Sequence, residues 1–211
     1  MAATATSLDF DIVTGAQSPG RNLPQRLGRV LWFPMWLMAV MGFTIGVVLA
    51  VVRANEVVDG GDAATLLQLQ HVVAGFMFIG FASVFAAISF AIARILGEFR
   101  SGGGDLQQAT GREVRTLKMP ATATAFIVTM AMAMMAIVVA VILHFVFAAD
   151  IVNTAASLEL AERRFIVLEG VRRMAIAVYL ISFMLGLGTI IQVLRFQAIR
   201  IRELPAEPTR G

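Results

Sequence analysis

The stretch MPATATAFIVTMAMAMMAIVVAVILHFVFAA, residues 119–149, decides the fold of this chain. Its polar side chains are three threonines and one histidine, His144. A transmembrane helix needs about 20 mostly apolar residues, and a helix satisfies all of its own backbone hydrogen bonds, as lipid demands. Residues 119–149 therefore predict a membrane-spanning helix.

Three further runs have the same character and predict three more spans, at residues 30–52, 70–96 and 165–197. The composition agrees, because the 211 residues are 58% hydrophobic and 15% charged. Soluble domains are nearer half apolar and a quarter charged. We therefore expect an all-α integral membrane protein, folded as a four-helix transmembrane bundle.

Polar segments are predicted on both sides of this membrane domain, which we place at residues 30–197. Residues 1–29 are expected to form a polar N-terminal tail, and residues 198–211 a C-terminal tail. The N-terminal segment lacks the basic region and apolar core of a signal peptide. Both tails are expected to lie in the cytoplasm, for the reason that follows.

Basic residues are distributed unequally between the two sides of the predicted membrane. Eleven lie at the ends assigned to the inside, namely Arg21, Arg26, Arg29, Arg94, Arg100, Arg112, Arg115, Lys118, Arg195, Arg200 and Arg202. Five lie at the outside ends, namely Arg53, Arg163, Arg164, Arg172 and Arg173. Because basic residues favour cytoplasmic loops, the chain is predicted to be a multi-pass protein of a bacterial inner (plasma) membrane.

Local signals predict where the helices begin and how they pack. Asp62 is a suitable N-cap for the helix that enters the second span. Pro34 is expected in the first turn of the first span, where its missing N–H costs little. The three consecutive glycines within residues 97–112 predict a flexible loop. Gly42 and Gly46 form a GxxxG pattern, expected to serve packing between helices of this chain.

Several function classes are disfavoured by what the sequence lacks. The chain has no cysteine, so disulfides, thiolate metal sites and thiol nucleophiles are excluded. No phosphate loop or nucleophile elbow occurs, and we expect no enzymatic activity from the chain alone. The net charge of +3 suits anionic lipid headgroups, and no nucleic-acid partner is expected.

The two histidines of the chain, His71 and His144, are predicted to lie at one depth. At about 1.5 Å per residue, His71 lies about 34 Å from the inner marker Arg94, and His144 about 36 Å from Pro120. Arg53 and Arg172 fall at the same level by the same arithmetic. All four helices thus bring polar groups to the outer rim. Depth permits the histidines to meet, but it does not fix the rotation of either helix.

This rim has three interpretations. Polar residues collect at helix ends because water is there, and Glu169 can simply pair with Arg172 or Arg173. Alternatively, His71 and His144 are the two axial ligands of a b-type haem, with Arg53, Arg172 and Arg173 holding its propionates. In the third interpretation, a histidine binds a quinone or a small anion. Other metal centres lack enough ligands.

Our leading prediction for function is a non-catalytic accessory or anchor subunit of a larger membrane complex. Its partners would be the lipid bilayer and another membrane protein or a second copy of the chain. The architecture is similar to that of small haem- or quinone-binding anchor subunits of respiratory complexes, an analogy of fold alone. The alternative is a haem b or quinone electron-transfer protein. A small-solute channel comes third, since the mid-spans are apolar.

Overall fold

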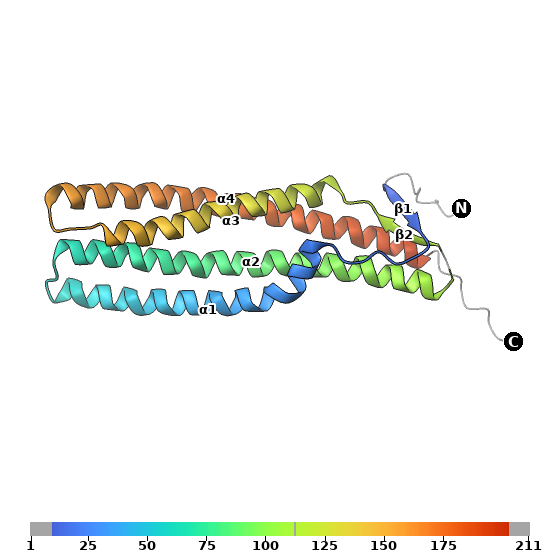
Figure 1. The fold of residues 1–211 in the computed structure, drawn as a ribbon, viewed down its shortest axis with the longest axis horizontal. Helices are drawn as coiled ribbons and strands as arrows, with labels where there is room; N and C mark the ends of the chain where they lie inside the picture. Colours follow the sequence, from blue (N-terminus) through green and yellow to red (C-terminus); the bar gives the residue numbers. More distant parts are fainter. Residues whose placement is uncertain (1–9, 112, 203–211) are drawn as a thin grey trace.

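The computed structural model describes residues 10–111 and 113–202 of the chain. Four helices dominate it: α1 (Leu23–Val58), α2 (Ala63–Ala109), α3 (Ala121–Ala149) and α4 (Ala155–Arg202). Two short strands, β1 (Ile12–Gly15) and β2 (Val114–Leu117), pair antiparallel at one end (Figure 1). All four helices are long and apolar enough to cross a membrane, as the sequence predicts. The outermost parts of both predicted tails, 1–9 and 203–211, lie outside the described residues.

The helices run along one long axis but differ in length (Figure 1). α2 and α4 have 47 and 48 residues, about 70 Å each, whereas the 29 residues of α3 span about 44 Å. The principal partner of α1 is α2, while α3 packs on α4, and α2 contacts both α3 and α4. α2 and α4 therefore project beyond the beginning of α3, and their projecting ends carry β1 and β2.

The interface between α1 and α2 depends on glycines. A Cβ added to Gly42 would lie 2.7 Å from the backbone nitrogen of Gly80. A Cβ on Gly28 would lie 2.5 Å from the carbonyl oxygen of Phe90. A Cβ on Gly46 would lie 3.1 Å from the side chain of Met77 on α2. Small residues let membrane helices approach closely, so the predicted role of the GxxxG pattern in packing within the chain is confirmed.

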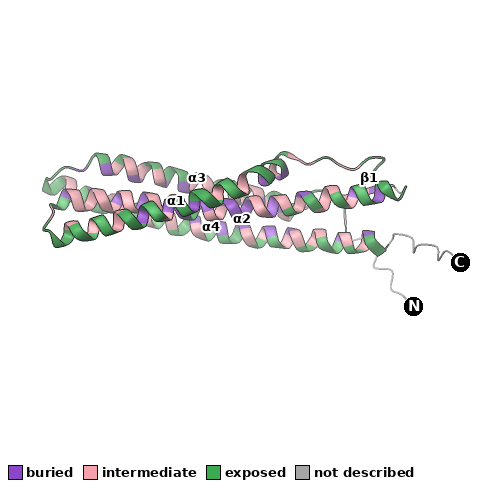
Figure 2. Ribbon diagram, turned by 90° about the horizontal axis from the view of Figure 1, so that it is seen from below, coloured by how far each residue is buried: buried purple, intermediate pink, exposed green. Residues whose placement is uncertain are grey.

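The core lies where α2, α3 and α4 meet. Tyr179 of α4 packs with Ala133 and Ile137 of α3, and its ring centroid lies 4.9 Å from that of Phe85. Outward faces of the helices are exposed along their whole length (Figure 2). Only 17% of the most apolar 18-residue stretch of α1 is buried. Large apolar side chains thus cover the outside of the molecule as well as its core.

The prediction of a flexible loop at residues 97–112 is wrong for the part that the structure describes. Helix α2 continues through the glycine run and ends only at Ala109. The glycines serve close approach: a Cβ on Gly104 would meet the Ser18 hydroxyl at 2.5 Å, and one on Gly103 would overlap the side chain of Arg200. Packing against α4 and the segment after β1 overrides the poor helix propensity of glycine.

The helix ends also differ from the expected spans. α1 begins at Leu23, inside the predicted tail, because Asn22 and Gln25 form a reciprocal capping box. Pro34 therefore lies inside α1 rather than in its first turn, and the first turns of the helix run at an angle to the rest (Figure 1), as proline in a helix causes. Asp62 is the N-cap of α2 as predicted. Neither strand was expected from the sequence.

Candidate functional site

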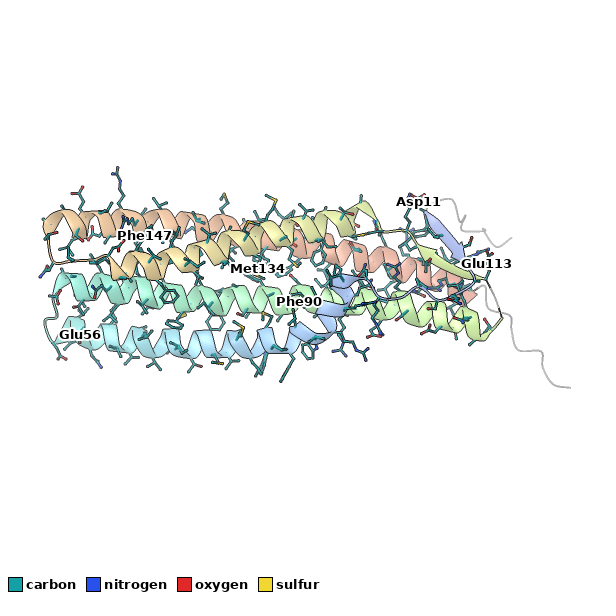
Figure 3. All side chains as sticks on the ribbon, in the orientation of Figure 1. Asp11, Glu56, Phe90, Glu113, Met134 and Phe147 are labelled. Carbon is teal, nitrogen blue, oxygen red and sulfur yellow. The ribbon has the colours of Figure 1, made fainter. Side chains whose placement is uncertain are left out.

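Two helices bring the histidines together at the end of the bundle where α1 turns into α2 and α3 into α4. His71 lies in the third turn of α2, and His144 lies in the last two turns of α3. Their Nδ1 atoms are 3.1 Å apart, and both side chains are fully buried. Phe147, one turn beyond His144, lies at this end of the bundle, as does Glu56 (Figure 3). The two rings thus form a direct hydrogen bond between α2 and α3.

The hydrogen-bond partners determine which nitrogen of each ring carries a proton. The Nε2 atom of His71 lies 3.3 Å from the carbonyl oxygen of Ala161 on α4. Because a carbonyl can only accept, His71 Nε2 donates, and in a neutral ring its Nδ1 is then an acceptor. His144 Nδ1 must therefore donate to His71. The pair links three helices in one chain of hydrogen bonds.

This assignment leaves one lone pair unused. His144 Nε2 is buried and has no hydrogen-bond partner. In a neutral ring that donates from Nδ1, Nε2 is an acceptor. A buried acceptor without a partner costs about 1–3 kcal/mol. The free nitrogen of His144 is thus the chemically open position of the site, able to accept a hydrogen bond or a proton.

Aromatic rings enclose the pair. Phe165 of α4 lies against both histidines, with ring centroids 5.3 Å from His71 and 5.7 Å from His144. Phe78 lies 5.2 Å from His144, and Phe147 lies 6.4 Å from His71. The pair therefore sits in a mostly apolar shell. Sequence reasoning missed these phenylalanines, although Phe78 follows His71 by two helical turns and Phe147 follows His144 by one.

The three arginines predicted to join the histidines do not form one cluster. Arg53 of α1 donates to the carbonyl oxygen of Leu66 and the side chain of Gln70, both at 3.3 Å. Arg172 pairs with Glu169 and lies over the ring of Phe78, 5.0 Å from its centroid. Arg173 is 79% exposed and also pairs with Glu169, at 3.4 Å. Of these three arginines, only Arg172 lies against the aromatic shell.

A haem between the two rings does not fit this packing. Metal–imidazole bonds are about 2 Å long, so an iron bound by both rings would hold their nitrogens about 4 Å apart. The Nδ1 atoms are 3.1 Å apart and bonded to each other. Phe165 and Phe78 also pack directly against the two histidine rings. Within the described residues, no three His, Asp or Glu side chains form a metal-binding group.

Comparisons with known proteins do not assign the chain to a family. No protein-family model, curated protein or solved structure matches it. The geometry of the chain itself is therefore the basis for inferring its function.

Proposed function

We propose that this chain is a multi-pass protein of the bacterial inner membrane that serves as a non-catalytic accessory or anchor subunit of a larger membrane complex. Both termini would lie in the cytoplasm. The observation that supports this proposal best is a groove on the outside of the bundle that suits a further transmembrane helix.

The apolar exterior supports the membrane placement. Exposed side chains on α1 include Val30, Met41 and Val48, and those on α4 include Met184 and Ile191. Large contiguous apolar surfaces are rare on monomeric soluble proteins, whose largest patch is about 300–600 Å². Lipid tails or other apolar helices would cover it.

The groove lies between α2 and α3 in the middle of the bundle and has a volume of about 790 Å³, including its open side. Phe90 and Met134, both in its lining, lie in this region in Figure 3. Its floor carries small residues, Ala86 and Ser89, and the hydroxyl of Ser89 is buried with no partner. Small residues, and hydroxyl groups that can form hydrogen bonds between helices, are typical of contacts between membrane helices. A partner helix would fill this groove.

Copurification tests the partner. The tagged chain would be extracted from its native membrane in mild detergent and analysed by native electrophoresis and mass spectrometry. Ala131 lines the groove and is exposed, so Ala131→Trp should fill the groove and release the partner. Met132→Trp is the matched control, since Met132 is exposed on the same helix but outside the groove lining. A monomer with no stable partner would contradict the proposal.

Single introduced cysteines test the orientation, because the chain has none of its own. A membrane-impermeant maleimide should label Asn153→Cys, in the turn between α3 and α4, on intact spheroplasts. It should label Glu113→Cys, next to β2, only after the membrane is opened. The reverse pattern would place the termini outside.

Absorption spectroscopy and flux assays test the two alternatives. The purified protein, supplied with haem during expression, should be colourless in both its oxidised and dithionite-reduced forms. Sharp reduced bands that disappear in His71→Ala and in His144→Ala would instead establish a haem electron carrier. Solute flux into liposomes that contain the chain alone would favour the channel.

A further inference from the structure

A second pocket lies at the opposite end of the molecule from the histidine pair. It has a volume of about 740 Å³, including its mouth, and four helices and β2 contribute to its walls. Asn22 and Gln25 line it from the beginning of α1, and Thr116 lines it from β2. The pocket therefore lies where the projecting parts of α2 and α4 meet the beginnings of α1 and α3.

The walls of this pocket differ along its length. Toward the middle of the bundle they are apolar, with Ala123, Phe126 and Ile127 of α3 facing Val193 of α4. Toward the strands they are polar, with Arg100 of α2. On α4 the lining runs from Thr189 to Arg200, about 16 Å along the helix. That length suits a polar headgroup together with the upper part of an acyl chain.

Arg200 is the feature that indicates a ligand. It lines the pocket yet is only 4% exposed. Its guanidinium donates to Gln107 at 2.5 Å and to Gln197 at 3.4 Å, both neutral amides, and its Nε atom has no partner. Among the described residues it forms no ion pair. Because buried charges are normally paired, we expect the guanidinium of Arg200 to bind an anion.

Arg100 adds a second positive charge to the lining of the same pocket. Its Nε atom is buried without a partner, and the part of the chain that the structure describes gives it no hydrogen bond or ion pair. None of the described residues that line the pocket is acidic. Two guanidinium groups with unused donors and an apolar wall behind them form a site with one polar and one apolar end.

We propose that this pocket binds an amphiphile with an anionic headgroup, a phosphate or a carboxylate, that Arg100 and Arg200 hold while its apolar chain lies against Phe126, Ile127 and Val193. Guanidinium groups match the geometry of phosphate and carboxylate oxygens. The site goes beyond the accessory role proposed above, and it is tested by binding alone, so that either proposal can fail without the other.

Native mass spectrometry of the full chain in neutral detergent tests the site. The probes are phosphatidylglycerol, oleate, phosphatidylcholine and inorganic phosphate, each titrated separately. Phosphatidylglycerol and oleate should form one-to-one complexes, and phosphatidylcholine should bind at least tenfold more weakly. Binding of inorganic phosphate as tight as that of the lipids would assign the site to a soluble anion and overturn the amphiphile.

Two variants and their controls separate the headgroup contact from the apolar contact. Arg100→Gln removes a charge without breaking a described hydrogen bond, and it should weaken phosphatidylglycerol binding at least tenfold. Arg202→Gln, an exposed arginine at the same end, is its control and should not change binding. Ala123→Leu should fill the apolar part of the pocket and weaken the binding of both amphiphiles. Ala121→Leu, at an exposed position of α3, should leave their binding unchanged.

Each result supports or contradicts the proposal. Retention of wild-type affinity in both Arg100→Gln and Ala123→Leu would show that lipids bind elsewhere on the apolar exterior. Equal binding of phosphatidylglycerol and phosphatidylcholine would contradict a role for the two arginines. Arg200→Lys keeps the charge and gives a further check, because it should retain more affinity than Arg200→Gln.

Discussion

Replacing Gly42 with alanine should loosen α1 from the rest of the molecule. The added Cβ would lie 2.7 Å from the backbone nitrogen of Gly80, whereas ordinary contact begins at 3.4 Å. The helices would therefore have to separate by 3.4 − 2.7 = 0.7 Å at this point. A gap of about 0.5–1 Å forfeits a quarter to a half of each dispersion contact, and overpacking of this kind costs about 1–3 kcal/mol.

The neighbouring atoms make this clash hard to relieve. The atoms closest to the new Cβ belong to the backbone of α2, at Gly80 and Phe76, and not to the end of a flexible side chain. Because the principal partner of α1 is α2, few other contacts hold α1 in place. Gly28→Ala should act in the same direction, since its Cβ would lie 2.5 Å from the carbonyl oxygen of Phe90.

Tryptophan fluorescence during unfolding by sodium dodecyl sulfate in mixed micelles measures the effect. Trp32 and Trp36 are the only tryptophans of the chain, and both lie on α1. Trp32 also reports the interface directly, because the guanidinium carbon of Arg94 lies 5.6 Å from its ring centroid. Gly42→Ala should unfold at lower detergent fractions than the wild type.

Gly188→Ala is the matched control. Nothing lies within 4 Å of a Cβ at Gly188, so the substitution should be neutral or stabilise its helix by up to about 1 kcal/mol. If Gly42→Ala were as stable as Gly188→Ala, then α1 would not lie at this distance from α2, and the interface described here would be wrong.

Three further predictions concern the histidine pair, the glycine run and the cap of α2. His71→Ala and His144→Ala should each destabilise the protein by about 1–3 kcal/mol through the partner left unpaired, and the double variant should cost less than the sum of the two in the same unfolding assay. Gly103→Ala should displace the side chain of Arg200, while Gly102→Ala, with nothing within 4 Å of its Cβ, should not; protease susceptibility of the α2 and α4 ends would show the difference. The Thr65 hydroxyl and backbone N–H groups lower the pKa of Asp62 below its ordinary value of 3.8, so its cap is complete above that value and is lost as the pH falls through the lowered pKa. Hydrogen exchange at Ala64 and Thr65 should therefore be faster in Asp62→Ala at neutral pH, and equal rates in the two proteins would contradict the cap.

The helices could be predicted from the sequence because long apolar runs carry a strong signal that needs no knowledge of tertiary contacts. Their ends could not, because they depend on partners far away in the chain. Gly102, Gly103 and Gly104 predict a loop when taken alone, but Arg200 lies against α2 where a side chain at residue 103 would be. The strands could not be predicted from the sequence either, since Ile12 pairs with Leu117, more than a hundred residues away in the chain.

The histidine site, too, could be predicted from the sequence only in part. Helical rise puts His71 and His144 at one depth, which is all that counting residues can give. Whether the two rings meet depends on how each helix is rotated about its axis. In the structure, Phe78 and Phe165 pack against the pair. Arg53 lies at the level of the histidines, but its side chain donates to Leu66 and Gln70 of α2. The sequence predicts the depth of these residues in the bundle, but not the direction in which their side chains point.

The continuity of α4 has a mechanical consequence. One unbroken helix carries the Ala161 carbonyl that holds His71 and, 39 residues later, the Arg200 side chain in the second pocket. These groups are about 58 Å apart along a single rigid rod. A slide of that rod by the rise of one residue, about 1.5 Å, would stretch the contact at the histidines and shift the guanidinium at the far end by the same distance. An axial shift of α4 would therefore change both contacts together.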